Sequence, residues 1–416
     1  MTPQRLFLLL IGLLVVNYLF DLLLGYLNAK RFKNDPPEVL ADLYDADEYQ
    51  RSQAYKAASY RFGLLSGGVS FLATLAFFLL DGFAWADALA RSWSSNEIAV
   101  ALVFFGVILL ASSLISLPFS YYRTFVLEER FGFNKTTKKT FVLDKIKGAL
   151  LGGLIGGGLL TALLLIYRET GSNFWWYAWI VITVFSILMN FFYTRLIVPL
   201  FNKQSPLEAG PLKEKLQTYA EKVGFTLSKI MVIDGSKRST RANAYFSGFG
   251  RQKQVTLYDT LLDDLSEEEV VAVLAHEIGH YKRNHIPINL FLGIATTGLT
   301  LFVFSLLVDN PILSEALAVT EPSFHLGLIA FGILYSPLSE ITGLLMNFIS
   351  RRFEFQADAY AASTFKAQPL IDALKKLAKN NLSNLSPHPT YVFVHYSHPP
   401  LDQRIEALAK QGAQGA

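Results

Sequence analysis

Long apolar runs with few charged residues dominate this chain and limit what it can fold into. Each run is close to the roughly 20 residues that a helix needs to cross the hydrocarbon core of a bilayer. We predict seven membrane-spanning helices, at residues 6–27, 62–80, 98–117, 146–167, 174–197, 286–308 and 324–349. The first run is too long for a cleaved signal peptide, so we expect it to be a retained span. The chain is therefore expected to be an all-α multi-spanning membrane protein.

The fourth run carries three glycines at four-residue spacing, Gly148, Gly152 and Gly156. This spacing allows two helices to pack closely, and it also suits a glycine-rich hinge.

Lys and Arg residues are concentrated in alternate connections between the runs. Six lie between residues 30 and 61, and six between residues 123 and 145. The neighbouring connections contain only Arg91, only Arg168 and, after the sixth run, none. Because basic residues favour the cytoplasmic side, we predict that the odd-numbered connections and the C-terminus are cytoplasmic and that the N-terminus is external.

Composition excludes several other classes of function. The chain has no cysteine, which rules out disulfides, a thiolate metal site and a cysteine nucleophile. The net charge of +3 is small, and no block of Lys and Arg resembles a nucleic-acid-binding patch. We expect the lipid bilayer and a peptide or protein substrate as partners, no nucleic acid, and a monomer.

Two segments resemble soluble protein, and we divide the chain around them into 1–201, 202–285, 286–350 and 351–416. The segment 202–285 is expected to contain an amphipathic helix at 211–223, a strand at 229–234, and a hairpin of strands 243–248 and 254–259 joined across 249–253. Ser266, followed by three glutamates, predicts the start of a further helix. The last segment is predicted to form two helices separated by a loop rich in Pro and His.

The helix that begins at Ser266 contains His276-Glu277-Ile-Gly-His280. Four-residue spacing places both imidazoles on one helical face, where they can bind one zinc ion through neutral nitrogens. Glu277 is adjacent but is not a ligand, and it can act as a general base toward water activated by the metal. Two histidines on a helix surface also occur without any metal.

Two histidines leave a catalytic zinc site one protein ligand short. Glu354 and Asp358 are four residues apart on a predicted helix, so Glu354 is a candidate third ligand and Asp358 a candidate acceptor for a ligand histidine. An ordinary solvated acidic face is an equally good explanation of this spacing. The competing ligands are His285, which a continuous helix would point away from the metal face, and three histidines in a loop, His388, His395 and His398.

His398 and Arg404 are candidate donors to the oxyanion that forms when water attacks a peptide carbonyl. A histidine flanked by prolines is also a common loop residue. Asp21 and Glu340 lie inside predicted spans, where ionisable groups usually face a cavity or a partner.

With these motifs in place, the sequence resembles the CAAX prenyl protease 1 family of integral-membrane zinc endoproteases. The resemblance extends along the whole chain, at residues 125–134, 199–203, 205–207, 243–248, 276–280, 354–358 and 397–400. It implies seven helices around a water-filled chamber, with a small α+β zincin-like metalloprotease part and one zinc ion on the cytosolic face. The eukaryotic relatives remove the last three residues from farnesylated C-termini, and some also cut upstream.

The resemblance also implies roles for individual residues. Glu354 is similar to the family's third ligand and Asp358 to the residue that supports a ligand histidine. His398 and Arg404 resemble residues that line the catalytic centre. The substrate backbone is expected to pair with an edge strand at Asn243, Ala244, Tyr245 and Phe246.

Three other readings of the sequence remain. HtpX-like quality-control proteases share the zinc motif but have about four spans. A site-2-type protease would place the motif inside an apolar run, whereas this motif is flanked by charged residues. A transporter with an incidental zinc site would leave Glu277 without a purpose. Because residues 410–416 carry no basic retrieval signal, we expect the bacterial inner membrane, with the endoplasmic reticulum as the alternative.

Overall fold

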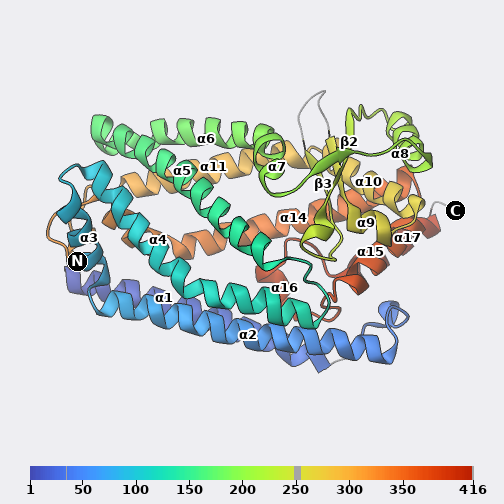
Figure 1. The fold of residues 1–416 in the computed structure, drawn as a ribbon, viewed down its shortest axis with the longest axis horizontal. Helices are drawn as coiled ribbons and strands as arrows, with labels where there is room; N and C mark the ends of the chain where they lie inside the picture. Colours follow the sequence, from blue (N-terminus) through green and yellow to red (C-terminus); the bar gives the residue numbers. More distant parts are fainter. Residues whose placement is uncertain (34, 248–253, 415–416) are drawn as a thin grey trace.

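The computed structural model describes residues 1–33, 35–247 and 254–414, which form an elongated molecule with long helices along one axis (Figure 1). The apolar helices are α1 (Pro3–Ala29), α2 (Ala46–Leu79), α4 (Glu97–Tyr122), α5 (Lys138–Thr170), α6 (Phe174–Phe192), α11 (His285–Ser305), α13 (Phe324–Leu334) and α14 (Ser336–Thr364). Three short helices connect them or extend them: α3 (Gly82–Trp93), α7 (Val198–Phe201) and α12 (Ile312–Glu315).

The apolar helices make this a multi-spanning membrane protein. Five continuous helical stretches of the described chain are long and apolar enough to cross a membrane, and the bent pair α13 and α14 raises that number to six. One of the five, Lys138–Phe201, contains both α5 and α6, with the short turn Gly171–Asn173 between them.

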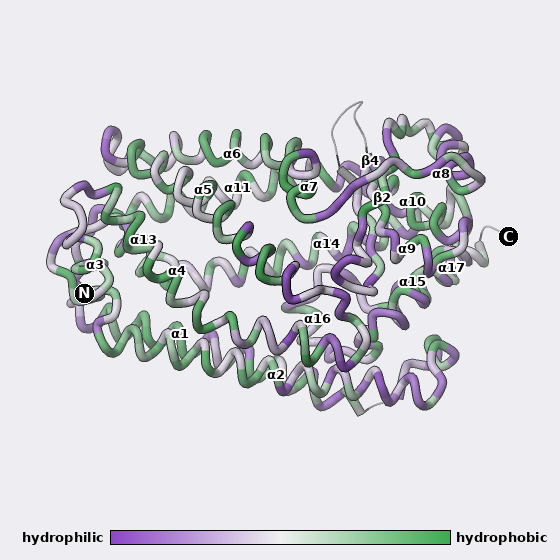
Figure 2. The backbone as a smooth tube through the Cα atoms, viewed as in Figure 1, coloured by the Kyte–Doolittle hydropathy of each residue, from purple (hydrophilic) through white to green (hydrophobic). Residues whose placement is uncertain are grey.

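The hydropathy of the backbone changes along the long axis. Figure 2 shows apolar residues along the helical bundle and hydrophilic ones around α8, α9, α15 and α17. Many large apolar side chains on the bundle are more than half exposed, for example Leu8, Leu109, Leu154, Phe291 and Ile341. Side chains of this kind face lipid without penalty, whereas a water-soluble protein rarely exposes so many.

Close packing between helices occurs at a different glycine from those the sequence suggested. A Cβ atom on Gly148, Gly152 or Gly156 would meet no atom within 4 Å, so of the two alternatives for this spacing, close packing at these residues is not observed. Gly298 of α11 is instead pressed against α6, because a Cβ there would lie 2.9 Å from the ring of Trp179.

At the hydrophilic end, a four-stranded sheet packs on several helices. Its strands are β1 (Gln204–Pro206), β2 (Lys229–Ile233), β3 (Ala244–Ser247) and β4 (Gln254–Tyr258), in the order β1-β2-β4-β3. β2 and β4 are parallel, and the other two pairs are antiparallel. The predicted strands of the hairpin are confirmed, while its turn at 249–253 lies outside the described residues. β3 is thus an edge strand among the strands that the structure describes.

The helices of this end are α8 (Pro211–Lys222), α9 (Asp259–Asp264), α10 (Glu267–Lys282), α15 (Ala367–Asn380), α16 (Pro389–His395) and α17 (Leu401–Gln414). α10 begins with a capping box, in which the backbone N–H of Ser266 donates to Glu269 at 2.7 Å and the backbone N–H of Glu269 donates to Ser266 at 3.4 Å. The core between sheet and helices includes Val255 and Leu257 of β4 and Leu274 and Ile278 of α10. α14 continues through residue 350, so one helix links the membrane bundle to this core.

Candidate active site

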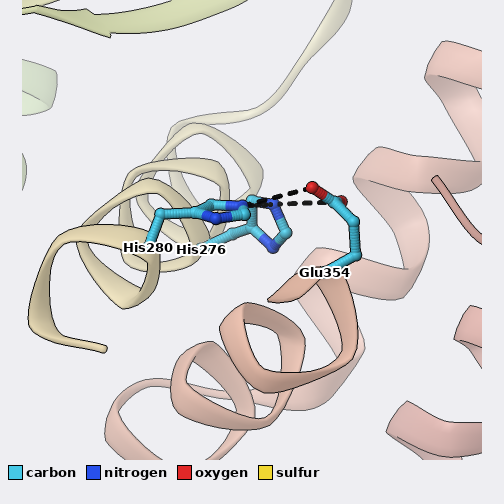
Figure 3. Close-up of side chains that lie close together, drawn as sticks. All are labelled: His276, His280 and Glu354. Carbon is cyan, nitrogen blue, oxygen red and sulfur yellow. Dashed lines mark hydrogen bonds and ion pairs between the residues drawn. The ribbon is translucent and has the colours of Figure 1, made fainter. Parts of the chain in front are cut away.

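Two helices cross closely and bring the candidate ligands together. Gly279, between the two histidines of α10, faces α14, where a Cβ atom would lie 3.0 Å from the backbone of Ala357. Glu354, Ala357, Asp358 and Ala361 share the buried face of α14. Figure 3 shows His276 and His280 pointing from α10 toward the carboxylate of Glu354 on α14. A side chain larger than hydrogen at residue 279 would force these helices apart.

The three side chains form a compact cluster that fits a cation. The Nε2 atoms of His276 and His280 are 3.1 Å apart, and the oxygens of Glu354 lie 3.5 Å and 3.3 Å from them. Two ligand atoms on a tetrahedral zinc ion, each at about 2.0–2.1 Å, lie about 3.3 Å apart. Oε2 of Glu354 is buried and accepts no hydrogen bond from the described residues. The donor set therefore fits one metal ion, and these three residues have their ligand atoms within 4.8 Å of one another.

His276 is held by a carboxylate on its far side. Its Nδ1 atom lies 2.8 Å from Oδ1 of Asp358, which is itself almost fully buried. Arg404 of α17 donates from Nε and Nη2 to the two oxygens of Asp358, at 2.8 Å and 2.7 Å. Arg404 also lies 3.2 Å from Oε2 of Glu354, so its charge offsets both carboxylates.

His280 is held by His285, which the sequence predicts to point away from the metal face. Nδ1 of His285 lies 3.0 Å from Nδ1 of His280, and Nε2 of His285 lies 2.8 Å from Oε1 of Gln356. A continuous helix would turn His285 away from the cluster. Instead α10 ends before Asn284, which has the left-handed φ of 60°, and the new helix α11 returns His285 toward His280. The sequence singled out His285 only as a competing metal ligand and did not single out Gln356; Asn284, just before His285, was the available signal.

His398 and Arg404, both predicted near the catalytic centre, lie at the cluster. Nε2 of His398 is 3.4 Å from Oε1 of Glu354, and this side chain is 63% exposed. It is thus accessible to a substrate, whereas Arg404 is buried.

Glu277 lies between the two histidines of α10 in the sequence and is partly buried. Burial raises the pKa of Glu277 above its ordinary value, and the positive charge of nearby His276 and His280 offsets some of that rise.

The predicted substrate-binding residues lie at the free edge of the sheet. The carbonyl of exposed Asn243 accepts a hydrogen bond from Tyr258 at 3.1 Å, and its side chain accepts one from the N–H of Ala244 at 2.8 Å. Ala244, Tyr245 and Phe246 follow in β3, which contacts α10.

The two acidic residues of the apolar runs do not join the cluster. Asp21 lies 3.9 Å from His395, and Glu340 is exposed on α14.

Comparisons with known proteins cover almost the whole chain. Residues 25–203 match the family described as "CAAX prenyl protease N-terminal, five membrane helices", and residues 206–411 match peptidase family M48. CAAX prenyl protease 1 of Saccharomyces cerevisiae is 36% identical, over 95% of this chain and 94% of its own. The human CAAX prenyl protease 1 homolog is 33% identical, over 94% and 92%.

A solved structure extends the similarity to the fold. The crystal structure of S. mikatae Ste24p superposes with a TM-score of 0.93 and 35% identity, covering 97% of this chain and 99% of that one. The agreement includes the N-terminal apolar helices, which an HtpX-like reading leaves unexplained. The chain therefore belongs to the CAAX prenyl protease 1 family and is a membrane-embedded metallopeptidase of family M48.

Proposed function

We propose that this protein hydrolyses peptide bonds with one zinc ion held by His276, His280 and Glu354. The observation that carries the proposal is the meeting of these three side chains at ligand distances across the contact between α10 and α14. Zinc, when bound there, would supply Lewis acidity to water and to the peptide carbonyl.

Glu277, His398 and Arg404 are assigned separate roles in the hydrolysis. Glu277 takes the proton from the attacking water and passes it to the leaving amine. His398 is exposed beside Glu354, where its N–H can donate to the developing oxyanion. Arg404 donates to Asp358 through two of its nitrogens, which supports a role in holding that carboxylate in place. Its positive charge would also stabilise the negative charge that develops on the substrate oxyanion.

The substrate is bound as an added strand. An extended peptide that pairs with the edge residues Asn243–Phe246 gains main-chain hydrogen bonds whatever its side chains are. The relatives named prenyl proteases support C-terminal, prenylated or otherwise membrane-associated peptides as substrates. We expect the protein to act as a monomer.

We further propose seven spans around a water-filled chamber, with the α+β zincin-like part facing the cytoplasm. Counting α5 and α6 as two spans, and α13 with α14 as one, gives this number from the observed helices. The chain then divides at residues 201, 285 and 350 into membrane and cytoplasmic parts. The bacterial inner membrane is our prediction for its location, with the endoplasmic reticulum as the alternative.

The direct test is Glu277→Gln in purified protein, assayed with farnesylated and plain peptides by mass spectrometry. We expect the metal content to stay at the wild-type level and turnover to fall by about 10²–10⁴-fold, because Glu277 is a base and not a ligand. The matched control is Glu268→Gln on the exposed side of the same helix, which should leave both unchanged. Wild-type cleavage rates in Glu277→Gln would refute the proposed chemistry.

A further inference from the structure

A cavity of about 740 Å³ lies between the sheet and the end of α6. Aromatic and aliphatic side chains from both sides form much of its wall, namely Phe185, Met189, Tyr193, Ile233, Tyr245 and Tyr258. A cavity of this size and lining is typical of sites for apolar ligands.

The cavity wall formed by α6 and the helical turn Tyr193–Ile197 after it is polar along one line, which argues against a lipid-facing groove. Ser186, Asn190 and Thr194 are four residues apart and all belong to the wall. Lipid-facing positions of membrane helices avoid such groups, whereas positions that line a water-accessible space contain them. The polar line therefore favours a water-accessible cavity over a lipid-facing one.

Tyr245 of the edge strand β3 forms part of the cavity wall. Side chains alternate along β3, so Tyr245 faces the cavity while Ala244 packs against the core of the sheet on the other face. Tyr245 is held by Gln204, whose Nε2 donates to its hydroxyl at 3.3 Å. A peptide added at the free edge of β3 would place every second side chain on the Tyr245 face.

We propose that this cavity is a specificity subsite that binds a large apolar side chain of the substrate. The proposal rests on the proposed strand pairing and adds to it a preference at alternate substrate positions. Backbone pairing is indifferent to sequence, so the subsite is what makes one register more productive than another.

The test is a series of peptides in which a single leucine or phenylalanine moves along an alanine background. Wild-type kcat/KM should rise about 10-fold when the apolar residue occupies the preferred position. A smaller rise in kcat/KM is expected when the apolar residue stands two residues from the preferred position. No rise is expected when it stands one residue from that position, because its side chain then faces the other side of the strand. In Met189→Ala and Tyr193→Ala, kcat/KM for the leucine and phenylalanine peptides should fall toward the value for the all-alanine peptide. The control is Leu188→Ala, an exposed neighbour that is not part of the wall.

The outcomes separate this inference from the proposed function. Cleavage without any positional preference, or equal losses on all peptides in both cavity variants, would overturn the subsite alone. A wild-type protein that cleaves no peptide would overturn the proposed function itself.

A second observation, the contact between His285 and His280, carries an inference of its own. If Nε2 of His280 is the ligand atom, its Nδ1 carries the proton and donates to Nδ1 of His285. His285 then has its proton on Nε2 and donates it to Oε1 of Gln356. Only this arrangement of protons satisfies every contact in the chain of three residues.

We infer that His285 is a positioning residue that fixes the tautomer and ring plane of His280. Its own ring is buried and stacked on Phe353 at 4.0 Å, with 8° between the planes. His276 is oriented by a charged carboxylate, whereas His280 is oriented by a neutral imidazole, so the second histidine is held without adding another negative charge to the site.

Three substitutions test this role through metal affinity, which is measured by competition with a chelator. Asn places an oxygen near the position of Nδ1, Gln places one near Nε2, and Leu has no acceptor. We expect His285→Leu and His285→Gln to bind zinc about 10–100-fold more weakly, and His285→Asn to recover most of the affinity. His388→Leu, at the start of α16, is the control and should bind zinc normally. Equal zinc affinity in the Asn and Leu variants, with thermal stability unchanged, would overturn the inference.

Discussion

Arg404 donates two hydrogen bonds to the carboxylate of Asp358, from Nε at 2.8 Å and from Nη2 at 2.7 Å. Oδ1 of the same carboxylate lies 2.8 Å from Nδ1 of His276. A residue of the last helix thereby supports a histidine of α10 through a residue of α14. Planar, two-point contact of this kind is specific to a guanidinium group and is not reproduced by an ammonium group.

Arg404→Lys should therefore weaken zinc binding although the charge is retained. We expect a loss of about 10-fold in metal affinity, together with slower turnover at saturating zinc. Equilibrium competition with a chelator and steady-state kinetics measure the two effects separately. Lys410→Ala, exposed on the same helix, serves as the control. Normal affinity in Arg404→Lys would show that Asp358 needs no second partner.

Substitutions of Glu354, Asp358 and His398 should have three different effects on metal content. Glu354→Ala removes a ligand and should strip zinc and activity together. Asp358→Ala should weaken metal affinity or activity by about 10–100-fold. His398→Ala should keep its zinc and turn over more slowly. Metal analysis of the purified variants decides among them, and full zinc in Glu354→Ala with none in His398→Ala would transfer the ligand role to His398.

Gly279→Ala should separate α10 from α14. The new methyl group would meet the backbone of Ala357 at 3.0 Å, and backbone of a packed helix cannot move aside cheaply. We expect a destabilisation of about 1–3 kcal/mol and a lower affinity for zinc. Thermal unfolding with and without added zinc measures both. Gly293→Ala is the control, since a Cβ there meets no atom within 4 Å; equal stability of the two variants would contradict the close crossing.

The start of α10 should make stability depend on pH. Burial raises the pKa of Glu269, but hydrogen bonds from Lys376 and Ser266 lower it more, so its pKa in the folded protein is below the usual value. A depressed folded pKa contributes stability that is fully present above the unfolded pKa of about 4.3 and is lost as the pH falls through the folded value.

Lys376→Met should therefore lower the unfolding temperature near neutral pH and reduce the loss of stability on acidification. The expected effect is about 1 kcal/mol, measured by thermal unfolding from pH 7 to pH 3. Lys366→Met, which breaks an exposed pair with Glu268 at 3.6 Å and a contact with the ring of Phe365 at 5.8 Å, is the control and should change little. Parallel pH curves for Lys376→Met and the wild type would contradict the assigned cause.

Sequence periodicity predicted what depends on local spacing. The apolar runs are helices, the histidines of the His-Glu-Ile-Gly-His motif share a face, and Glu354 meets them because both helices adjoin the same end of the bundle. These features follow from hydrophobic length and a repeat of 3.6 residues, which a single sequence contains.

Features that depend on breaks in a helix were missed. The left-handed Asn284 redirected His285 toward His280, and no periodic pattern encodes a single change of φ. Likewise, Pro337 stands in the first turn of α14, where the chain bends by 56° from α13, within a run predicted as one span. The predicted loop after α15 also contains the short helix α16.

α14 carries apolar surface for the bundle at one end and Glu354 at the other, without interruption. The position of Glu354 beside the two histidines therefore depends on how this helix is placed in the bundle. A chain that has not inserted α14 keeps its two histidines on α10 but lacks a fixed third carboxylate. Such a chain would lack the complete set of three ligand side chains that fits a metal ion.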